Sequence, residues 1–306
     1  MTMPLFTILT PTFNRAHTLP ALKASIDLQT FKDFEWLIVD DGSTDGTENL
    51  VAMWEKTSLY PIRRLYSTNG GKHRALNRGI PEAAGRWIYI VDSDDSIPYD
   101  ALANIFAFIP EAEADSGVGG IMGLKQNSKG QRIGEDFPPS LIRRDAAALT
   151  FMDGLRGDKA EVFKASVLRK FPFPEFPDEK FITECVVWFR IAKAGFDLLL
   201  LREPIYTCEY RADGLSAKSF MLRLANPCGT LLFYAEELSL SYPLRSLFRE
   251  AVNYVRFSLL CFTRCKMSPP KLPLRTKLLV SAAVPFGLMV AVIDIVRLAA
   301  NRKKNR

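Results

Sequence analysis

The sequence predicts an α/β protein whose mainly parallel sheet carries helices on both faces. Short apolar runs alternate with helix-like stretches through the first hundred residues, as they do in repeated strand–helix–strand units. Two of these runs end in acidic clusters, which is typical of strand ends that face a ligand. Hydrophobic residues make up 48% of the chain, so a sizeable core is available and overall disorder is excluded.

The first two units follow directly from the hydrophobic pattern. Residues 5–9 form an apolar strand, and a helix-like stretch covers residues 18–29. A second strand over residues 35–39 ends at an acidic pair, after which Ser43 or Thr44 is expected to cap a helix.

The pattern then repeats with a strand at residues 63–66, a helix at 72–84 and a strand at 87–91. This alternation implies right-handed crossovers and places ligand groups at the carboxyl ends of the strands. The second half of the chain is looser and is expected to shape the acceptor site. Its expected elements are helices at 102–108 and 181–194 and strands at 117–124, 198–201 and 205–210, with a turn-rich stretch at 127–139.

The length of 306 residues suits one catalytic domain with an appendage. We expect a catalytic domain over residues 1–218, divided into a nucleotide-binding half (1–100) and an acceptor half (101–218), and a helical region over 219–306. The five cysteines lack paired metal or redox spacing, which favours reduced thiols in the cytosol. The N-terminus shows no features of a secretory signal.

The cluster Asp92-Ser93-Asp94-Asp95 follows an apolar strand, so its carboxylates should emerge together at the edge of the sheet. Close negative charges need a cation, and hard oxygen ligands suit Mg²⁺ or Mn²⁺ bound together with substrate phosphates. The alternative is a solvated acidic turn that caps the next helix.

Two further segments lie at equivalent strand ends. Asp41 and the glycine after it are suited to contact a base or ribose, although a plain turn and helix cap is the more common explanation of an isolated Asp-Gly-Ser. Residues 69–77 join two glycines to the cations Lys72 and Arg74, which suits a diphosphate, but they match no P-loop. His73, taken by itself, is expected at the surface rather than as a base.

These clusters, in this order, resemble glycosyltransferase family 2 from Pro4 to about Asp100. The motifs that carry the resemblance are PTFNR (11–15), QTFKDFE (29–35), VDDGSTD (39–45), NRGI (77–80), Gly85 and DSDD (92–95).

The resemblance implies the A-type glycosyltransferase fold, a nucleotide-sugar donor that is usually a UDP-sugar, and Mn²⁺ or Mg²⁺ as cofactor. It implies that Asp41 contacts the base, that Asp92 and Asp94 hold the metal, and that Ser93 lies at the donor. The nucleotide pocket would be lined by Pro11, Thr12, Phe13, Asn14 and Arg15.

An inverting mechanism needs one base and no covalent intermediate, with the metal and Lys72 or Arg74 offsetting the charge of the leaving diphosphate. In many family members the base lies in a Glu-Asp pair that opens a late helix, and here Cys185 stands at the aspartate position. We therefore expect Glu184, beside Trp188 on one helix face, to be the base. The alternative is that Glu184 only caps the helix.

Two more residues come from segments that resemble bacterial surface-polysaccharide transferases of this family. Asp158 is the second choice for a catalytic residue, and the alternative is that it only stabilises a turn. Arg211 would reach the diphosphate from a loop, although a surface arginine is the default.

Residues 278–296 form an apolar segment long enough to cross a bilayer, with basic residues after it. A single crossing would separate the basic tail from the cytoplasmic donor. We therefore expect a peripheral or monotopic protein on the cytoplasmic face of the inner membrane. The apolar segment would lie in the membrane plane or form a hairpin with residues 252–262, and its basic residues would contact anionic lipid. The alternative is a buried helix.

The leading hypothesis is a hexosyltransferase that extends a polysaccharide or lipid-linked glycan of the cell envelope. A noncatalytic sugar-nucleotide-binding or scaffold protein is the alternative, because Cys185 replaces the usual aspartate. Nucleic acid is not expected as a partner of this chain of net charge +6, since its cations lack an aromatic-interleaved pattern.

Overall fold

The N-terminal half of the chain builds four parallel strands. The computed structural model describes residues 3–208, 219–265 and 270–304, and the order of these four strands in the sheet is β3-β2-β1-β4. All four were predicted from the apolar runs. They are β1 (Phe6–Thr12), β2 (Phe34–Asp40), β3 (Ile62–Tyr66) and β4 (Trp87–Ile90).

The second half extends this sheet with strands of both directions. They are β5 (Val118–Gln126), β6 (Arg132–Ile133), β7 (Arg143–Arg144), β8 (Ala160–Lys164) and β9 (Asp197–Thr207). The sheet continues as β4-β8-β5-β9-β7, with β8 antiparallel to both of its neighbours and β6 paired to β5. The first four strands are parallel as predicted, and β5 and β9 are also parallel to each other, whereas β6, β7 and β8 run antiparallel to their neighbours.

Two strands in this half differ from the sequence prediction. β8 was missed, because its five residues include two charged ones and read as a turn. β9 joins the two strands predicted at 198–201 and 205–210. Its pairing with β5 shifts register near Pro204, so an irregularity in the ladder accommodates residues that looked like a loop.

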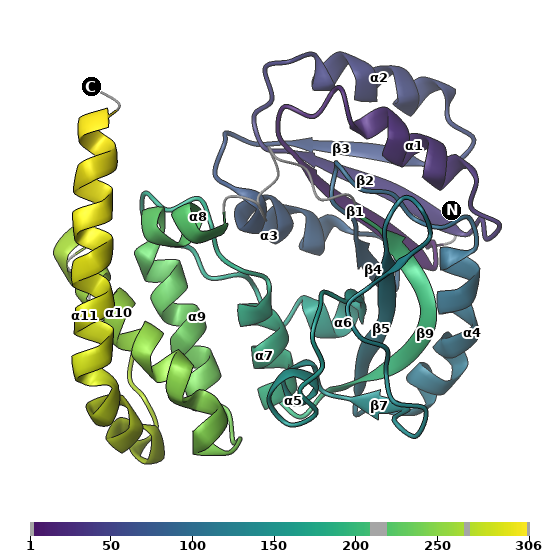
Figure 1. The fold of residues 1–306 in the computed structure, drawn as a ribbon. Helices are drawn as coiled ribbons and strands as arrows, with labels where there is room; N and C mark the ends of the chain where they lie inside the picture. The colour runs from purple at the N-terminus through teal and green to yellow at the C-terminus, as the bar shows by residue number, and fades with distance from the viewer. Residues whose placement is uncertain (1–2, 209–218, 266–269, 305–306) are drawn as a thin grey trace.

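Helices cover both faces of the sheet, as predicted (Figure 1). Along β1, Phe6 and Ile8 pack into one apolar cluster and Leu9 into the other, which follows the period of two in a strand. One face carries α1 (Leu19–Asp27), α2 (Thr47–Thr57) and α4 (Ala101–Ala114). The other carries α3 (Lys72–Glu82), α5 (Ala146–Phe151), α6 (Ala165–Leu168) and α7 (Cys185–Lys193).

Two predicted helix starts are wrong. The N-cap of α2 is Gly46, not Ser43 or Thr44. The Ser43 hydroxyl instead accepts a hydrogen bond from the backbone N–H of Asn14. The late helix begins at Cys185 rather than at residue 181.

The described residues after 218 are helical. They form α8 (Ser219–Ala225), α9 (Pro227–Ser239), the 3₁₀ helix η1 (Leu244–Leu247), α10 (Phe248–Cys265) and α11 (Leu274–Lys304). Helices α9, α10 and α11 share a separate apolar cluster, and α7 lies between α9 and the sheet (Figure 1). The predicted boundary at residue 218 lies at the edge of 209–218, outside the described residues, and stays a prediction.

Helix α11 packs on α10 through one stripe. The buried residues Ala283, Gly287, Ala291 and Asp294 recur at intervals of three or four, and a Cβ at Gly287 would lie 2.5 Å from the Cβ of Val255 on α10. The segment Leu274–Val296 is long and apolar enough to cross a membrane, yet only 22% of its most apolar window is buried. The helix therefore packs on α10 as the alternative expected, but it leaves most of this apolar window uncovered.

Candidate functional site

The carboxyl ends of three parallel strands bring most of the predicted donor residues to one edge of the sheet. β1 lies between β2 and β4, and its last residue, Thr12, pairs with Asp40. The backbone N–H of Asp41 donates to the carbonyl of Thr12 at 2.8 Å. The segments that begin at Pro11, Asp40 and Asp92 therefore emerge side by side, as the sequence predicted.

The loop after β1 is fixed to the loop after β2. Asn14, with a positive φ of 53°, accepts the backbone N–H of Thr44 at 2.8 Å and donates its own N–H to the Ser43 hydroxyl at 2.9 Å. This loop holds the Arg15 guanidinium 3.5 Å from the carboxylate of Asp94. A cation thus stands beside the acidic cluster.

The residues before Asn14 differ in their accessibility. Pro11 and Thr12 end β1 and are buried, whereas the Phe13 side chain is 44% exposed. The Thr12 hydroxyl is buried without a hydrogen-bond partner in the structure. Of these three, Phe13 alone presents its side chain to solvent at this edge.

Asp41 anchors the loop that precedes α3. Its carboxylate accepts the backbone N–H groups of Gly70 at 2.8 Å and Gly71 at 2.7 Å and the side-chain amide of Asn69 at 3.1 Å. Gly71 has a φ of 96°, and a Cβ there would lie 2.0 Å from the carbonyl oxygen of Lys180. Asp41 therefore has a structural role that the sequence did not reveal, and its contact with a base stays a prediction.

Lys72 joins the two acidic residues that the sequence placed far apart. Its ammonium pairs with Asp92 at the end of β4 and with Glu184 at the start of α7, at 3.0 Å. Burial opposes the charge of Lys72, but the two carboxylates outweigh it and raise its pKa. Burial likewise opposes the charge of Asp92, yet Lys72 holds its pKa below the usual value. Lys72 and Asp92 are thus held in their charged forms beside the carboxylate of Glu184.

The two residues after Lys72 point elsewhere. Arg74 donates to the carbonyl of Phe176 at 2.7 Å and lies 3.3 Å from the carboxylate of Glu175. His73 is 2% exposed, so its predicted place at the surface is wrong. It shares the buried face of α3 with Leu76, and burial lowers its pKa to about 4.

The acidic cluster itself is held by a residue that the sequence analysis missed. The Tyr206 hydroxyl accepts the backbone N–H of Asp92 at 3.0 Å and donates to the carboxylate of Asp95 at 2.7 Å. Burial and the charge of Asp92 raise the pKa of Asp95 to about 7. The carbonyl of buried Ser93 accepts the hydroxyl of Thr18. These bonds fix the backbone from which the carboxylates project.

Over the described ranges, no three His, Cys, Asp or Glu side chains form a ready-made metal site. A nucleotide-bound Mg²⁺ or Mn²⁺ needs only one or two carboxylates, because phosphates and water supply its other ligands. Asp94 is partly exposed beside Arg15, and Asp92 lines a cavity. These two carboxylates fit that mode of binding.

Glu184 does not cap its helix through its side chain. It occupies the N-cap position of α7 without a capping hydrogen bond, and its carboxylate reaches Lys72 instead. The neighbouring Cys185 packs among apolar residues, and burial, followed by the charge of Glu161, raises its pKa to about 12. A thiol that keeps its proton is no general base, which leaves the carboxylate of Glu184 as the predicted base at the start of this helix.

A cavity connects the donor side of the site with Glu184. Three of its polar residues, Lys125, Glu161 and Tyr206, were not predicted. Lys125 directly follows the strand predicted at 117–124, so the rule that ligand groups lie at strand ends could have identified it. Glu161 lies on β8, which was not predicted. The cavity is lined by Lys72, Ile90, Asp92, Lys125, Lys159, Ala160, Glu161, Glu184, Trp188 and Tyr206.

The remaining predicted residues are less well connected. Asp158 is exposed in the loop before β8 and does not line the cavity. Its carboxylate raises the pKa of Lys125 and of Glu161. Arg211 lies outside the described residues.

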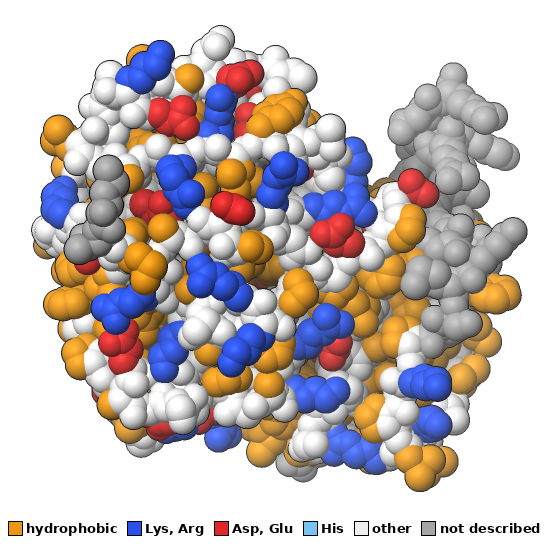
Figure 2. Space-filling model, turned by 180° about the vertical axis from the view of Figure 1, so that it is seen from behind, with side chains coloured by type: hydrophobic (Ala, Val, Ile, Leu, Met, Phe, Trp, Pro, Cys, Tyr) orange, Lys and Arg blue, Asp and Glu red, His pale blue; other side chains and the backbone are white. Residues whose placement is uncertain are grey.

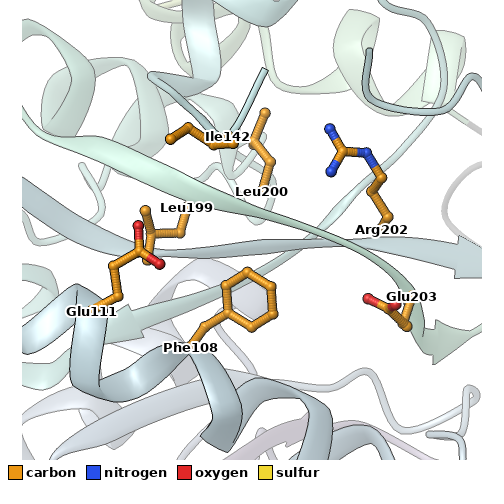
Figure 3. Close-up of a pocket in the computed structure, with 7 residues that line it drawn as sticks. All are labelled: Phe108, Glu111, Ile142, Leu199, Leu200, Arg202 and Glu203. Atoms are coloured by element: carbon orange, nitrogen blue, oxygen red, sulfur yellow. The ribbon is translucent and has the colours of Figure 1, made fainter. Parts of the chain in front are cut away.

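A larger cavity, of about 310 Å³, lies away from these groups between α4 and β9 (Figure 3). The Arg202 side chain at its wall donates to the carbonyls of Pro138 and Leu141, so it is committed to the fold. No residue predicted for the site belongs to this cavity, which is lined by Phe108, Glu111, Ile142, Leu199, Leu200, Arg202 and Glu203.

The family model "Glycosyl transferase family 2" matches residues 7–171, more than half of the chain. The PGL/p-HBAD biosynthesis glycosyltransferase of Mycobacterium bovis is 40% identical over 114 residues, which cover 37% of this chain and 44% of that protein. The GalNAc(5)-diNAcBac-PP-undecaprenol beta-1,3-glucosyltransferase of Campylobacter jejuni is 27% identical over 62% of this chain and 60% of its own length. The chain thus spans about half the length of these curated relatives.

Solved structures share the fold. The structure of Staphylococcus aureus TarS 1–349 superposes with a TM-score of 0.56 at 19% identity, covering 94% of this chain and 80% of that one. The mannosyltransferase PcManGT of Pyrobaculum calidifontis, in complex with GDP-Man and Mn²⁺, gives 0.56 at 20% identity and covers 99% and 87%. Both matches support the expected A-type fold.

Proposed function

Because the chain belongs to glycosyltransferase family 2, we propose that it transfers a hexose from a nucleotide sugar to a polysaccharide or lipid-linked acceptor with inversion. The observation that carries this proposal is the Lys72 bridge. It joins Asp92, on the donor side of one cavity, to Glu184, the only carboxylate at the start of α7. A single displacement requires a group that holds the donor and a base that activates the acceptor, both facing one cavity.

The donor binds along the edge of the sheet. The exposed ring of Phe13 stacks on the base, Asp41 contacts the base, and Arg15 approaches the diphosphate. Asp92 and Asp94 would hold Mn²⁺ or Mg²⁺, which when bound offsets the charge of the leaving diphosphate. A UDP-sugar is the preferred donor, and the complex of TarS with UDP-GlcNAc supports this choice.

Lys72 couples donor binding to the base. The diphosphate competes with Glu184 for the Lys72 ammonium, and Glu184 is then free to accept a proton. The carboxylate of Glu184 takes the proton of the acceptor hydroxyl while the hydroxyl oxygen bonds to the anomeric carbon. The bond from that carbon to the diphosphate oxygen breaks, and the nucleoside diphosphate leaves with the electron pair.

We also propose that α11 lies on the cytoplasmic face of the inner membrane. Figure 2 shows orange side chains along the flank that carries the C-terminal helices, and on α11 Leu278, Met289 and Val296 are each more than half exposed. Exposed Arg275 and Lys277 lie at the start of this helix, where they would meet anionic headgroups. The relative from C. jejuni, whose name includes a PP-undecaprenol glycan, supports an acceptor held at a membrane.

The noncatalytic alternative depended on Cys185. Its burial, together with the position of Glu184 in the cavity, favours an enzyme.

The test is calorimetric titration of the full chain with UDP, with and without Mn²⁺, followed by UDP-sugar turnover. We expect metal-dependent binding that is lost in Asp92→Ala plus Asp94→Ala. A folded wild type that binds no nucleotide and turns over no nucleotide sugar would refute the proposal.

A further inference from the structure

We propose that Lys125 and Glu161 form the subsite for the hydroxyl groups of the transferred sugar, and that this pair determines which hexose the enzyme accepts. The inference rests on the proposed function, because it concerns the same donor. Lys125 lies outside the motifs that carry the family resemblance, and the segment that contains Glu161 was singled out for Asp158 only.

The position of the pair is the first argument. Lys125 and Glu161 line the same cavity as Asp92 and Glu184. In the proposed reaction the anomeric carbon must lie between the diphosphate held at Asp92 and the hydroxyl activated by Glu184. The cavity holds only about 40 Å³, so the sugar ring would lie over its opening, where the side chains of its wall face the ring hydroxyls.

The rigidity of the pair is the second argument. Both residues project from the sheet rather than from loops: Lys125 lies on β5, and Glu161 lies on β8 and pairs in register with Met122 of β5. The ammonium of Lys125 also lies 4.5 Å from the centre of the Tyr206 ring, its register partner on β9. Groups fixed by a sheet select one arrangement of hydroxyls over another, because they do not adjust to a second arrangement.

The chemistry of the pair is the third argument. Burial raises the pKa of Glu161 to about 8, so at neutral pH its carboxyl group retains a proton and is able to donate as well as accept. Burial opposes the charge of Lys125, but Asp158 and Asp92 raise its pKa even where Glu161 is protonated, so the ammonium keeps its charge. Two polar groups beside the rings of Tyr206 and Trp188 form a wall suited to a hexose, which presents both hydroxyls and apolar C–H faces.

The experiment compares the affinity for UDP with that for UDP-sugars. Calorimetry on the full chain with Mn²⁺ would use UDP, UDP-glucose, UDP-galactose, UDP-GlcNAc, UDP-GalNAc and GDP-mannose as probes. The variants are Lys125→Met, Glu161→Ala and Glu161→Gln. The matched control is Glu203→Ala, an exposed residue on β9 at the remote cavity (Figure 3).

We expect Lys125→Met and Glu161→Ala to lower the affinity for the preferred nucleotide sugar by about tenfold or more, because each removes a hydrogen bond to a charged or buried group. Affinity for UDP should stay within about twofold, since the uridine and diphosphate contacts remain. Glu161→Gln should retain most of the affinity, because its amide also donates and accepts. Thermal melting would establish that each variant is folded.

Three results would overturn the inference. Wild-type affinity for every nucleotide sugar in both Lys125→Met and Glu161→Ala would exclude contacts with the sugar. An equal loss for UDP and UDP-sugars would assign the pair to the diphosphate or to the fold. A wild type that binds none of the probes would refute the proposed function as well, which distinguishes that failure from the first two.

Discussion

Glu184→Gln is the sharpest test of the proposed mechanism. The substitution keeps the size of the side chain and removes the group that would accept the proton. A positioned general base typically contributes a factor of about 10² to 10⁴, so turnover should fall at least about a hundredfold. The fold should survive, because Lys72 retains its pairing with Asp92 when Glu184 is neutral.

The assay is release of UDP from a UDP-sugar, measured with the lipid acceptor or, more slowly, with water as acceptor. Calorimetric affinity for UDP with Mn²⁺ should not fall, since in the proposed complex the diphosphate has taken Lys72 and Glu184 does not contact the nucleotide. The matched control is Glu175→Gln, which neutralises a carboxylate paired with Arg74 at 3.3 Å outside the cavity. Its turnover should be close to that of the wild type. Near wild-type turnover in Glu184→Gln would refute the assignment of the base.

Three further predictions concern stability and membrane binding. The pKa of Glu161 is raised to about 8, so the wild type should lose more stability than Glu161→Gln as pH rises from 4.5 towards 8; the raised pKa of Asp95 acts on both proteins equally. From pH 5 to pH 8, the free energy of unfolding of Glu161→Gln should gain about 2 kcal/mol relative to that of the wild type, after a discount for partial exposure. The same stability difference between the two proteins at pH 5 and at pH 8 would contradict this. The pKa of buried His73 is lowered to about 4, so stability should fall as pH drops from 6.5 to 4, by about 3 kcal/mol relative to His73→Leu; parallel pH–stability curves for the two proteins would argue against it. Asp substitutions at Met289 and Val292, both more than half exposed on α11, should abolish flotation with phosphatidylglycerol vesicles, whereas Leu59→Asp, on a fully exposed loop residue, should not; flotation retained in the α11 variants would exclude this face as the contact.

Local pattern was sufficient for the donor half of the site. The apolar runs that became β1, β2 and β4 each end at a predicted polar segment, and adjacent parallel strands bring their carboxyl ends together. The buried position of His73 was also within reach, because it lies three residues before Leu76 on the apolar face of α3. It was missed because the histidine was considered by residue type rather than by its place in the helix.

The cavity residues from the second half of the chain were harder to predict, for a physical reason. Glu161 lies on a strand whose short, charged sequence has no distinctive periodicity, and this strand is stabilised by its neighbours β4 and β5 rather than by local preference. Tyr206 contacts the backbone of Asp92 across 114 positions of sequence. Such contacts depend on strand order, which local patterns do not encode.

By itself, the sequence determined the family and the parallel half of the sheet and predicted the carboxylates at its edge, because all of these follow from short motifs and from the period of the apolar residues. Only the tertiary structure decided that Lys72 connects Asp92 with Glu184, that Asp41 anchors the loop before α3, and that α11 leaves most of its apolar surface uncovered. Each of these depends on which distant elements pack together, since an ion pair, a loop anchor and an exposed face are all defined by neighbours that are remote in the chain.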